Sequence, residues 1–491
     1  MASADVAAYS KFTKDTLLAG IAYSVSALSG LVLLPILSKT LGAEAYGIWS
    51  QIQVTIPLLM LLTSLQLGFA MTRFLAAKTD KGKISAGFFS ILAVTSLTSI
   101  LFSILMFVFA EPFAAAVFGG AEAAPFVRLA AFLVLLTTID QTIIDYFVAF
   151  RQMVKYSIFI IAQVAGEVAL IAYLVFSGFG LYGAISALLV IRAILFVIGF
   201  LVVKPQIRFS SPRLSAIKPY LSFSLPLLPV ALGWWVYSLS DRYIIGYFLG
   251  IKAVGVYSAA YNLGGVAAFF FSPLAIILLP AITYLYENNK IQEVKTHLKY
   301  SLKLYLIFAI PAVFGLSILA KPLLATLATA EFAAAAFWII PIVALATALL
   351  GASGVISRVL MLFKRTRIIG LIDGACAILN VVMNIILVPV MGILGAAIST
   401  LAVFMLRLMA ISIISFRQLS FDIDWKFIAK ALISSFIMGA VVWTLSPTGA
   451  VNILIAVVVG AMIYFAALML LRGFTRQEYE FLRDILRGVR S

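Results

Sequence analysis

The chain has 491 residues, of which 64% are hydrophobic and 11% charged, and its mean hydropathy is +1.15. Soluble domains are about 45–50% apolar and about 25% charged, so this composition excludes a water-soluble protein and requires lipid to cover most of the outer surface. The net charge is +16, but the basic residues lie in short loops between apolar segments, which favours a membrane protein over a nucleic-acid-binding one. Cys376 is the only cysteine and His297 the only histidine. We therefore expect neither a disulfide within the chain nor a His-based metal or catalytic centre, and no cofactor.

Fourteen apolar segments follow one another along the chain, each long enough to cross a membrane as a helix. One helical crossing needs about 20 mostly apolar residues, whereas a membrane β-strand needs about 9–11, so these lengths predict an all-α polytopic membrane protein. The expected spans are 15–38, 47–71, 85–110, 126–149, 157–177, 184–203, 221–247, 255–282, 302–327, 336–360, 369–390, 395–416, 428–446 and 452–471.

Positive charge is distributed very unevenly between the two sides of these spans. Of the 35 Lys and Arg residues, 27 fall on one side, three (Lys39, Lys252 and Lys321) on the other, and five inside spans. Cytoplasmic loops carry an excess of Lys and Arg, so this bias predicts a multi-pass protein of the cytoplasmic membrane with both termini in the cytoplasm. The tail at 473–491 alternates apolar and basic residues at helical spacing, which predicts a cytoplasmic amphipathic helix on the membrane surface.

Short motifs recur between the two halves of the chain. Residues 41–50 read LGAEAYGIWS and residues 249–258 read LGIKAVGVYS, so they share the frame L-G-x-x-A-x-G-x-x-S at a spacing of 208 residues. The pattern Gly-x-x-Gly-Ala at 180–184 recurs 212 residues later at 392–396. A third echo, Phe-Arg at 150–151 and Phe-Lys at 363–364, is 213 residues apart. Similar spacings at matching places predict an internal repeat of two six-helix sets.

The repeat predicts the domain organisation. We expect an N-terminal six-helix bundle at 1–218, a C-terminal six-helix bundle at 219–426, two additional transmembrane helices within 427–472, and the amphipathic tail at 473–491. An even number of helices per repeat gives both bundles one orientation, so their pseudo-two-fold axis should lie along the membrane normal. Rocking of one bundle against the other would then give alternating access to a central cleft.

These motifs, together with SDRYIIG at 240–246 and the plan of six, six and two helices, resemble the polysaccharide transporter (Wzx-like flippase) family of the multidrug/oligosaccharidyl-lipid/polysaccharide superfamily. The resemblance covers nearly the whole chain and implies a MATE-like fold. It implies translocation of a polyprenyl-pyrophosphate-linked oligosaccharide from the cytoplasmic to the outer leaflet, for cell-surface polysaccharide biosynthesis. The partners that it implies are this lipid-linked substrate, membrane lipids and other glycan-assembly membrane proteins.

Charged residues inside the spans are candidate functional positions, because a charge at the bilayer centre costs at least about 2.5–3.5 kcal/mol. The resembling family lines its cleft largely with the first, second and fourth helices of each half. This makes Arg242 and Arg358 the candidates for binding the pyrophosphate, since guanidinium presents a fork of donors to phosphate oxygens. Asp140, Asp145 and Asp241 either bind a coupling proton or sodium ion or balance the charge of these arginines. Asp145 and Arg358 are equivalent repeat positions, which would let them face each other across the axis.

Two further pairs of charges lie on consecutive spans. Glu167 and Arg192 lie near mid-depth on the fifth and sixth predicted helices, and Asp373 and Arg407 lie on the matching helices of the second half. We expect each pair to form a structural ion pair.

Two other classes of function were weighed against a flippase. An ion-coupled multidrug or cation antiporter of the same superfamily needs a pocket lined by carboxylates, whereas the predicted cleft carries both signs of charge. A membrane enzyme that builds glycans needs catalytic residues on sizeable outer loops, but the predicted outer loops are short, and the longest is the Ala-rich segment 111–125. No G-x-x-x-x-G-K-[ST] motif occurs, so energy would come from an ion gradient or from substrate flow. We therefore predict a transporter and not an enzyme.

Overall fold

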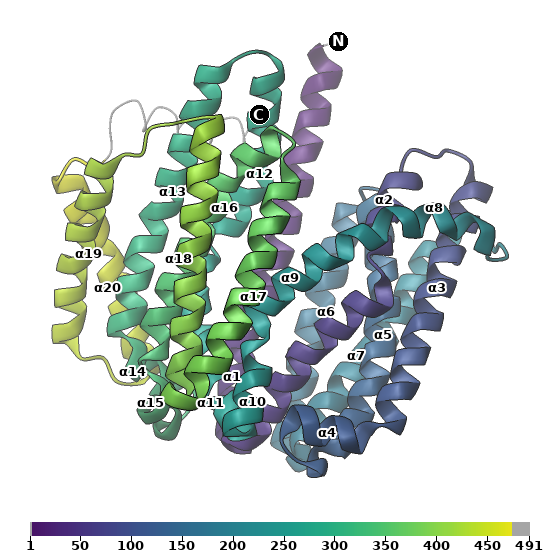
Figure 1. Ribbon diagram of the computed structural model, residues 1–491, viewed down its shortest axis with the longest axis horizontal. Coiled ribbons are helices and arrows are strands. Elements are labelled where there is room, and N and C mark those ends of the chain that lie inside the picture. Colours follow the sequence, from purple (N-terminus) through teal and green to yellow (C-terminus); the bar gives the residue numbers. More distant parts are fainter. Residues whose placement is uncertain (1, 474–491) are drawn as a thin grey trace. The chain divides into compact units, whose positions relative to one another are not determined.

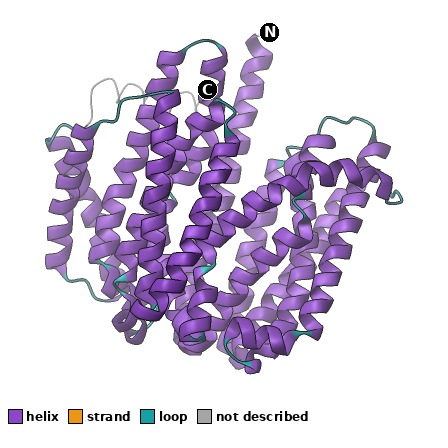
Figure 2. Ribbon diagram, viewed as in Figure 1, coloured by secondary structure: helices purple, strands orange, loops and turns teal. Residues whose placement is uncertain are grey.

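The computed structural model describes residues 2–473, which form α-helices joined by short turns, with no β-strand in that range (Figures 1 and 2). The chain divides into two compact units. The first unit is Leu17–Ser258, and the second unit is Ala259–Ser491 together with Met1–Thr16. The amphipathic helix predicted in 473–491 lies outside the described residues.

The first unit contains the helices up to the start of α11. Their bounds are α1 (Ala2–Ser64, from Leu17 onward), α2 (Leu67–Phe74), α3 (Lys81–Val108), α4 (Ala110–Phe118), η1 (Ala121–Ala123), α5 (Ala124–Ala149), α6 (Met153–Leu174), η2 (Val175–Phe179), α7 (Gly180–Val203), η3 (Lys204–Gln206), α8 (Leu214–Ser224), η4 (Leu225–Leu227), α9 (Leu228–Leu239), α10 (Asp241–Leu249) and α11 (Ile251–Gly264).

The second unit contains the remaining helices. Their bounds are η5 (Gly265–Ala268), α12 (Phe271–Glu287), α13 (Ile291–Ile318), α14 (Ala320–Leu327), α15 (Ala330–Ala336), α16 (Ile339–Leu362), α17 (Thr366–Met391), α18 (Ile393–Gln418), α19 (Trp425–Leu445) and α20 (Gly449–Leu470).

The predicted spans fall on helices or on runs of helices, which confirms the all-α polytopic architecture. Eleven stretches of the described chain are long and apolar enough to cross a membrane. Two of these stretches, Gly20–Ser64 and Met153–Gln206, each contain two of the predicted spans. The predicted span 255–282 is divided between α11 and α12, with the turn η5 between them, and each of these helices is shorter than 18 residues. The number of fourteen crossings therefore stays a prediction.

One segment differs from its predicted structure. Residues 111–125 were expected to form an outer loop, but most of them lie in α4, in η1 and in the start of α5. The physical reason is composition, because alanine has the highest helix propensity of all residues. Gly119 ends α4 with φ +77°, a left-handed conformation that glycine adopts without strain.

The repeated glycines have the same backbone conformation in both copies. Gly42 (φ 80°, ψ −178°) interrupts α1, and Gly250 (φ 82°, ψ 170°) separates α10 from α11. Gly180 (φ 58°, ψ −143°) and Gly392 (φ 64°, ψ −148°) precede α7 and α18 in the same way. Residues with a Cβ essentially do not adopt these combinations, so the motifs contain glycine because the chain must turn there.

The third echo also has matching geometry. Arg151 and Lys364 have φ of 53° and 57°, and each follows a phenylalanine that ends a helix, Phe150 after α5 and Phe363 after α16. All three echoes thus mark the same local structure in the two halves. The two compact units divide at residue 258, beyond the end of the first repeat at 218, because α8 packs on α2 and α3, and α10 on α4.

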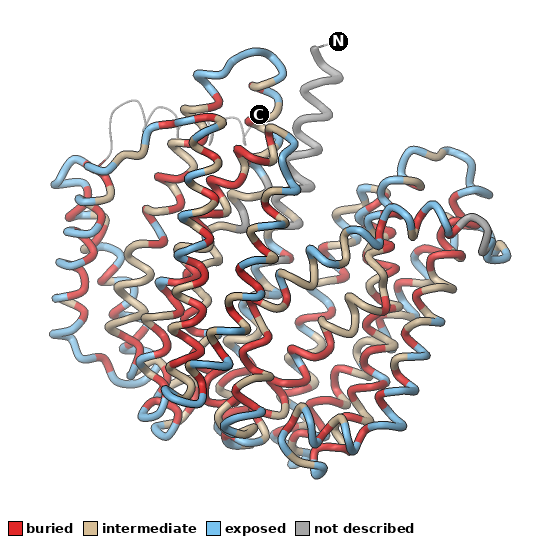
Figure 3. The backbone as a smooth tube through the Cα atoms, viewed as in Figure 1, coloured by how far each residue is buried: buried red, intermediate tan, exposed pale blue. Residues whose placement is uncertain are grey.

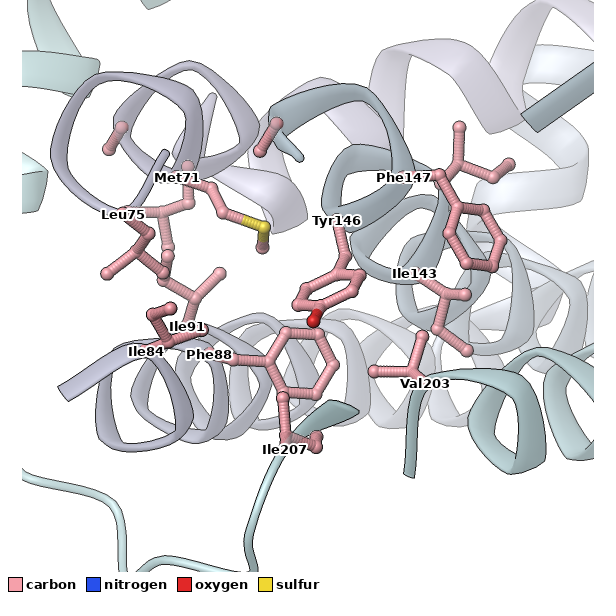
Figure 4. Close-up of a cluster of buried hydrophobic side chains, with 14 of the residues drawn as sticks. Met71, Leu75, Ile84, Phe88, Ile91, Ile143, Tyr146, Phe147, Val203 and Ile207 are labelled. Carbon is pink, nitrogen blue, oxygen red and sulfur yellow. The ribbon is translucent and has the colours of Figure 1, made fainter. Parts of the chain in front are cut away.

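Each unit has its own apolar core. In the first unit, α2, α3, α5 and α7 meet around Phe88, Tyr146 and Phe147, which are almost completely buried (Figure 4). The rings of Phe88 and Tyr146 pack edge to face with centroids 5.3 Å apart. In the second unit, Tyr305 of α13 is buried against α16 and donates to the carbonyl of Ala348 over 2.9 Å. These cores hold the helices that carry the buried charges.

Burial runs along the faces where helices meet, and large apolar side chains cover much of the outside (Figure 3). Leu97, Ile378 and Phe436 are each about 70% exposed on long helices. Exposed apolar surface on this scale is what a lipid-facing protein presents.

The start of α19 is fixed to α13 by one carboxylate. Asp424 caps the helix by accepting from the Phe427 N–H over 2.9 Å, and its other oxygen lies 3.0 Å from the buried Nζ of Lys303. Lys303 also lies over the Phe427 ring at 4.6 Å. Burial raises the pKa of the Asp424 carboxyl, but the hydrogen bonds from Phe427 and Lys303 outweigh it and hold this pKa below its usual value.

Asp424→Ala is expected to lower the thermal stability of the purified protein. It removes a helix cap, worth about 1 kcal/mol, and it takes the carboxylate from the buried Lys303. Asp424→Asn retains a capping oxygen and should cost less. Because the folded pKa is depressed, this stabilisation is present above the unfolded pKa and is lost as pH falls through the folded value. Melting curves of both variants from pH 7 to pH 3 check this, and equal melting temperatures for wild type and Asp424→Ala would contradict it.

Candidate functional site

Four of the sequence-predicted charges meet in two ion pairs. In the first unit, Arg192 Nε of α7 lies 2.8 Å from Glu167 Oε1 of α6. In the second unit, Arg407 Nε of α18 lies 2.7 Å from Asp373 Oδ1 of α17. The arginine of α18 also donates to the hydroxyl of Ser353 on α16. Consecutive helices at the same place in each half are thus linked by an ion pair.

Asp241 and Arg242 neutralise each other. Arg242 Nη1 lies 2.7 Å from Asp241 Oδ1 and donates to the Ser238 carbonyl over 2.9 Å, while Tyr257 donates its hydroxyl hydrogen to Asp241 Oδ2. Both charged side chains are only 3% exposed. The guanidinium also lies over the Tyr257 ring at 5.5 Å. This arrangement favours charge balance over ion binding as the role of Asp241.

Arg358 has different surroundings. It lies on α16 and is partly buried, with Nη1 donating to the Met361 sulfur over 3.1 Å and the guanidinium 5.7 Å from the Phe271 ring centre. Its Nε is buried and makes no hydrogen bond. Among the described residues no carboxylate pairs with Arg358. This cation inside a span therefore keeps donors that the protein does not use.

The two remaining aspartates lie on α5. Asp145 accepts from Gln141 Nε2 over 2.8 Å and packs on Gly68 of α2, where a Cβ would overlap the carboxylate. Asp140 is completely buried, and neither of its carboxylate oxygens has a hydrogen-bond partner among the described residues. Asp145 belongs to the first unit and Arg358 to the second, so the expectation that they face each other stays a prediction.

Glycines of the two motif copies meet inside the first unit, a contact that the sequence interpretation missed. A Cβ on Gly47 would overlap the carbonyl oxygen of Ile251, and a Cβ on Gly255 would overlap the carbonyl oxygen of Ala43. These positions are equivalent at the repeat spacing of 208 residues, so the contact is reciprocal. A two-fold relation between the motif copies produces such a contact. The signal in the sequence was the second glycine of the shared frame.

Hydrogen bonds hold the same helices together beyond the glycines. Trp235 Nε1 of α9 donates to the Val54 carbonyl of α1 over 3.1 Å, and Thr55 Oγ1 lies 2.7 Å from the Tyr243 hydroxyl oxygen on α10. The indole and the Tyr243 ring pack edge to face at 5.5 Å. The second part of α1 is thus fastened to α9, α10 and the start of α11.

Comparison with known families decides the membership of the chain. The model of the family described as polysaccharide biosynthesis protein matches residues 12–285, more than half of the chain. The chain belongs to this family. A second family model, MatE, matches residues 226–386, which overlap the first match.

Two curated relatives come from Haloferax volcanii. The probable low-salt glycan biosynthesis flippase Agl15 is 25% identical over 262 residues, which are 52% of this chain and 54% of that protein. The probable flippase AglR is 26% identical over 336 residues, 64% of this chain and 67% of that protein. The chain thus matches about half of the length of the first relative and about two thirds of the second.

Solved structures show the fold. The lipid II flippase MurJ, in an inward closed conformation, matches with a TM-score of 0.75 at 17% identity, over 96% of this chain and 99% of that chain. An inward-facing multidrug resistance MATE family transporter of the MOP superfamily matches with a TM-score of 0.65 at 14% identity, over 79% and 93%. The predicted MATE-like fold is confirmed, and the chain is a multi-pass membrane protein.

Gly255→Ala is expected to separate α1 from α11, because its methyl group would overlap the carbonyl oxygen of Ala43. In a Cys376→Ser background, Ser50→Cys places a thiol at a buried position of α1 beside this contact. Maleimide should label that thiol several-fold faster when Gly255→Ala is added. The matched control is Gly233→Ala, in helix α9, where a Cβ meets nothing within 4 Å. Equal labelling rates with and without Gly255→Ala would refute a role for this contact in closure.

Proposed function

We propose that the chain is a flippase that moves a polyprenyl-pyrophosphate-linked oligosaccharide from the cytoplasmic to the outer leaflet of the cytoplasmic membrane by alternating access. Family membership, the names of the two relatives and the MATE-like fold support a lipid-linked glycan as substrate. The excess of Lys and Arg on one side supports cytoplasmic termini, with the basic side facing the leaflet that supplies an anionic lipid. Other glycan-assembly membrane proteins are its proposed partners.

Arg358 is the observation that carries this proposal. An arginine inside a span is retained against a cost of at least about 2.5–3.5 kcal/mol, so it needs a compensating anion. Among the described residues no carboxylate supplies that anion. A pyrophosphate would bring several charged oxygens to the unused donors, and guanidinium binds phosphate through two parallel hydrogen bonds. We therefore assign Arg358 to the pyrophosphate of the substrate.

Arg242 is the second proposed pyrophosphate ligand, but it differs from Arg358 in being neutralised. It would have to leave Asp241 and the Ser238 carbonyl before it could bind a phosphate. Its contribution would therefore belong to a conformation in which this pair has opened.

An antiporter of cationic drugs is the alternative within the same fold. Such a transporter needs carboxylates that a cation can reach, whereas Asp241 is buried against Arg242 and Tyr257, and Asp140 has no exposed surface. An uncompensated Arg358 would repel a cationic substrate. The flippase is therefore favoured, and because the relatives are named as flippases we propose transport without catalysis.

Arg358→Gln should slow flipping by about 10- to 100-fold, because a hydrogen bond to a charged group contributes about 1.5–3 kcal/mol. The measurement uses vesicles that contain the purified protein and a labelled polyprenyl-pyrophosphate oligosaccharide, with exposure detected by an impermeant glycosidase. Arg358→Lys retains the charge without the fork and should be intermediate. The matched control is Arg367→Gln, which removes an exposed arginine at the start of α17. Wild-type rates in Arg358→Gln would refute the assignment of Arg358, and absence of flipping by the wild type would refute the proposed function.

A further inference from the structure

Asp140 is a titratable group that the proposed transport of a pyrophosphate does not use. It lies within α5, has no exposed surface, and neither carboxylate oxygen has a hydrogen-bond partner among the described residues. An ionised carboxylate in such a place is strongly unfavourable, because burial removes its hydration and nothing replaces it. Asp140 therefore either holds a proton or gains a cationic partner in another conformation.

A cationic partner is close. The charged groups that act electrostatically on Asp140 are Arg192 of α7 and Glu167 of α6, and both helices pack against α5. Arg192 is already bound to Glu167 at 2.8 Å. With all three groups ionised, the cluster would carry two negative charges and one positive charge. One proton on Asp140 makes it neutral.

Other charges on the elements packed around α5 lie towards helix ends. They are Arg73 on α2, Lys81 and Lys83 on α3, and Glu111 on α4. On α5 itself, Asp145 is held by Gln141, and Arg128 pairs with Glu111 at 3.1 Å. None of these groups compensates Asp140.

The second half of the chain contains the contact that the first half lacks. The spacing of 213 residues that relates Phe150 to Phe363 carries Asp140 onto Ser353. Ser353 hydrogen bonds to Arg407, and the same arginine holds Asp373. An arginine on the last helix of a half can thus reach both the preceding helix and this position on the fourth helix. In the first unit the corresponding arginine, Arg192, is bound to Glu167 but not to Asp140.

We propose that Asp140 is a proton-binding site, and that Arg192 exchanges Glu167 for Asp140 when Asp140 releases its proton. The proton passes from the carboxylic acid to water, Arg192 stays cationic throughout, and the carboxylate left behind takes the guanidinium as its counter-ion. The exchange rests on the proposed function only where it serves as the proton-coupling step of flipping.

A proton fits this site better than a metal cation does. A metal ion would add positive charge beside Arg192, and no group of three or more His, Cys, Asp or Glu among the described residues could hold one. A proton needs a single carboxylate oxygen and leaves the Glu167–Arg192 pair intact.

Infrared spectroscopy of the purified full-length protein in lipid nanodiscs tests the site without any substrate. The carboxylic-acid C=O band that is present in wild type and absent in Asp140→Asn belongs to Asp140, and its loss with rising pH reports release of the proton. Arg192→Gln removes the counter-ion, so the band should persist to a pH higher by about one unit or more. Glu167→Gln releases Arg192 towards Asp140, so the band should disappear at a lower pH.

The matched control is Arg407→Gln, which removes the corresponding arginine of the second half and should leave the band unchanged. Asp140→Ser copies the side chain of the second half and gives a second reference spectrum if Asp140→Asn does not fold. Shifts of opposite sign in the two variants support the exchange. A band that is absent from wild type at every pH, or that titrates identically in Arg192→Gln and Glu167→Gln, overturns it. Loss of the band on replacing choline chloride by sodium chloride at constant pH would overturn the assignment to a proton.

The same vesicles that report flipping distinguish this site from the proposed function. If wild type responds to a proton gradient and Asp140→Asn flips at a rate independent of it, the exchange is the coupling step. If wild type flips no lipid-linked glycan while the infrared shifts occur as described, the proposed function is wrong and the proton site stands.

Discussion

A charge at membrane depth has to be neutralised by the protein or by a ligand, because neither lipid nor a packed helix interface hydrates it. The helices of both units are arranged around this requirement. Glu167 with Arg192 and Asp373 with Arg407 link neighbouring helices, and Asp241 neutralises Arg242 through its own neighbour on the chain. Where neutralisation is incomplete, the remaining group is a candidate for function: a cation at Arg358 and a carboxyl at Asp140.

The backbone obeys a second constraint, which comes from the repeat. Gly42 and Gly250 have the same φ and ψ, a conformation that side-chain-bearing residues do not adopt, so the chain turns in the same way in both copies. One turn further on, Gly47 and Gly255 let the two copies approach until backbone meets backbone. A motif of ten residues thus supplies both the turn and the close contact, and larger side chains at those glycines would prevent the contact.

Much of this structure could be predicted from the sequence. Hydropathy located the helices, and helix number and spacing placed Glu167 beside Arg192, because consecutive spans are neighbours and buried charges pair. Resemblance supplied the MATE-like fold that the solved structures confirm. The Ala-rich segment 111–125 was predicted wrongly, because a break in hydropathy does not exclude helix. Helix rotation was not readable either, so neither the isolation of Asp140 nor the partners of Arg242 could be foreseen from their positions.

Binding of a pyrophosphate headgroup tests the central claim most directly, because it needs neither a complete glycan nor a transport cycle. The measurement is calorimetric titration of farnesyl pyrophosphate, a short-chain isoprenoid pyrophosphate, into the purified protein in nanodiscs. The account predicts saturable binding by wild type, binding at least about tenfold weaker in Arg358→Gln, and none of farnesol. Equal affinities for wild type and Arg358→Gln would contradict the assignment of this arginine to the substrate.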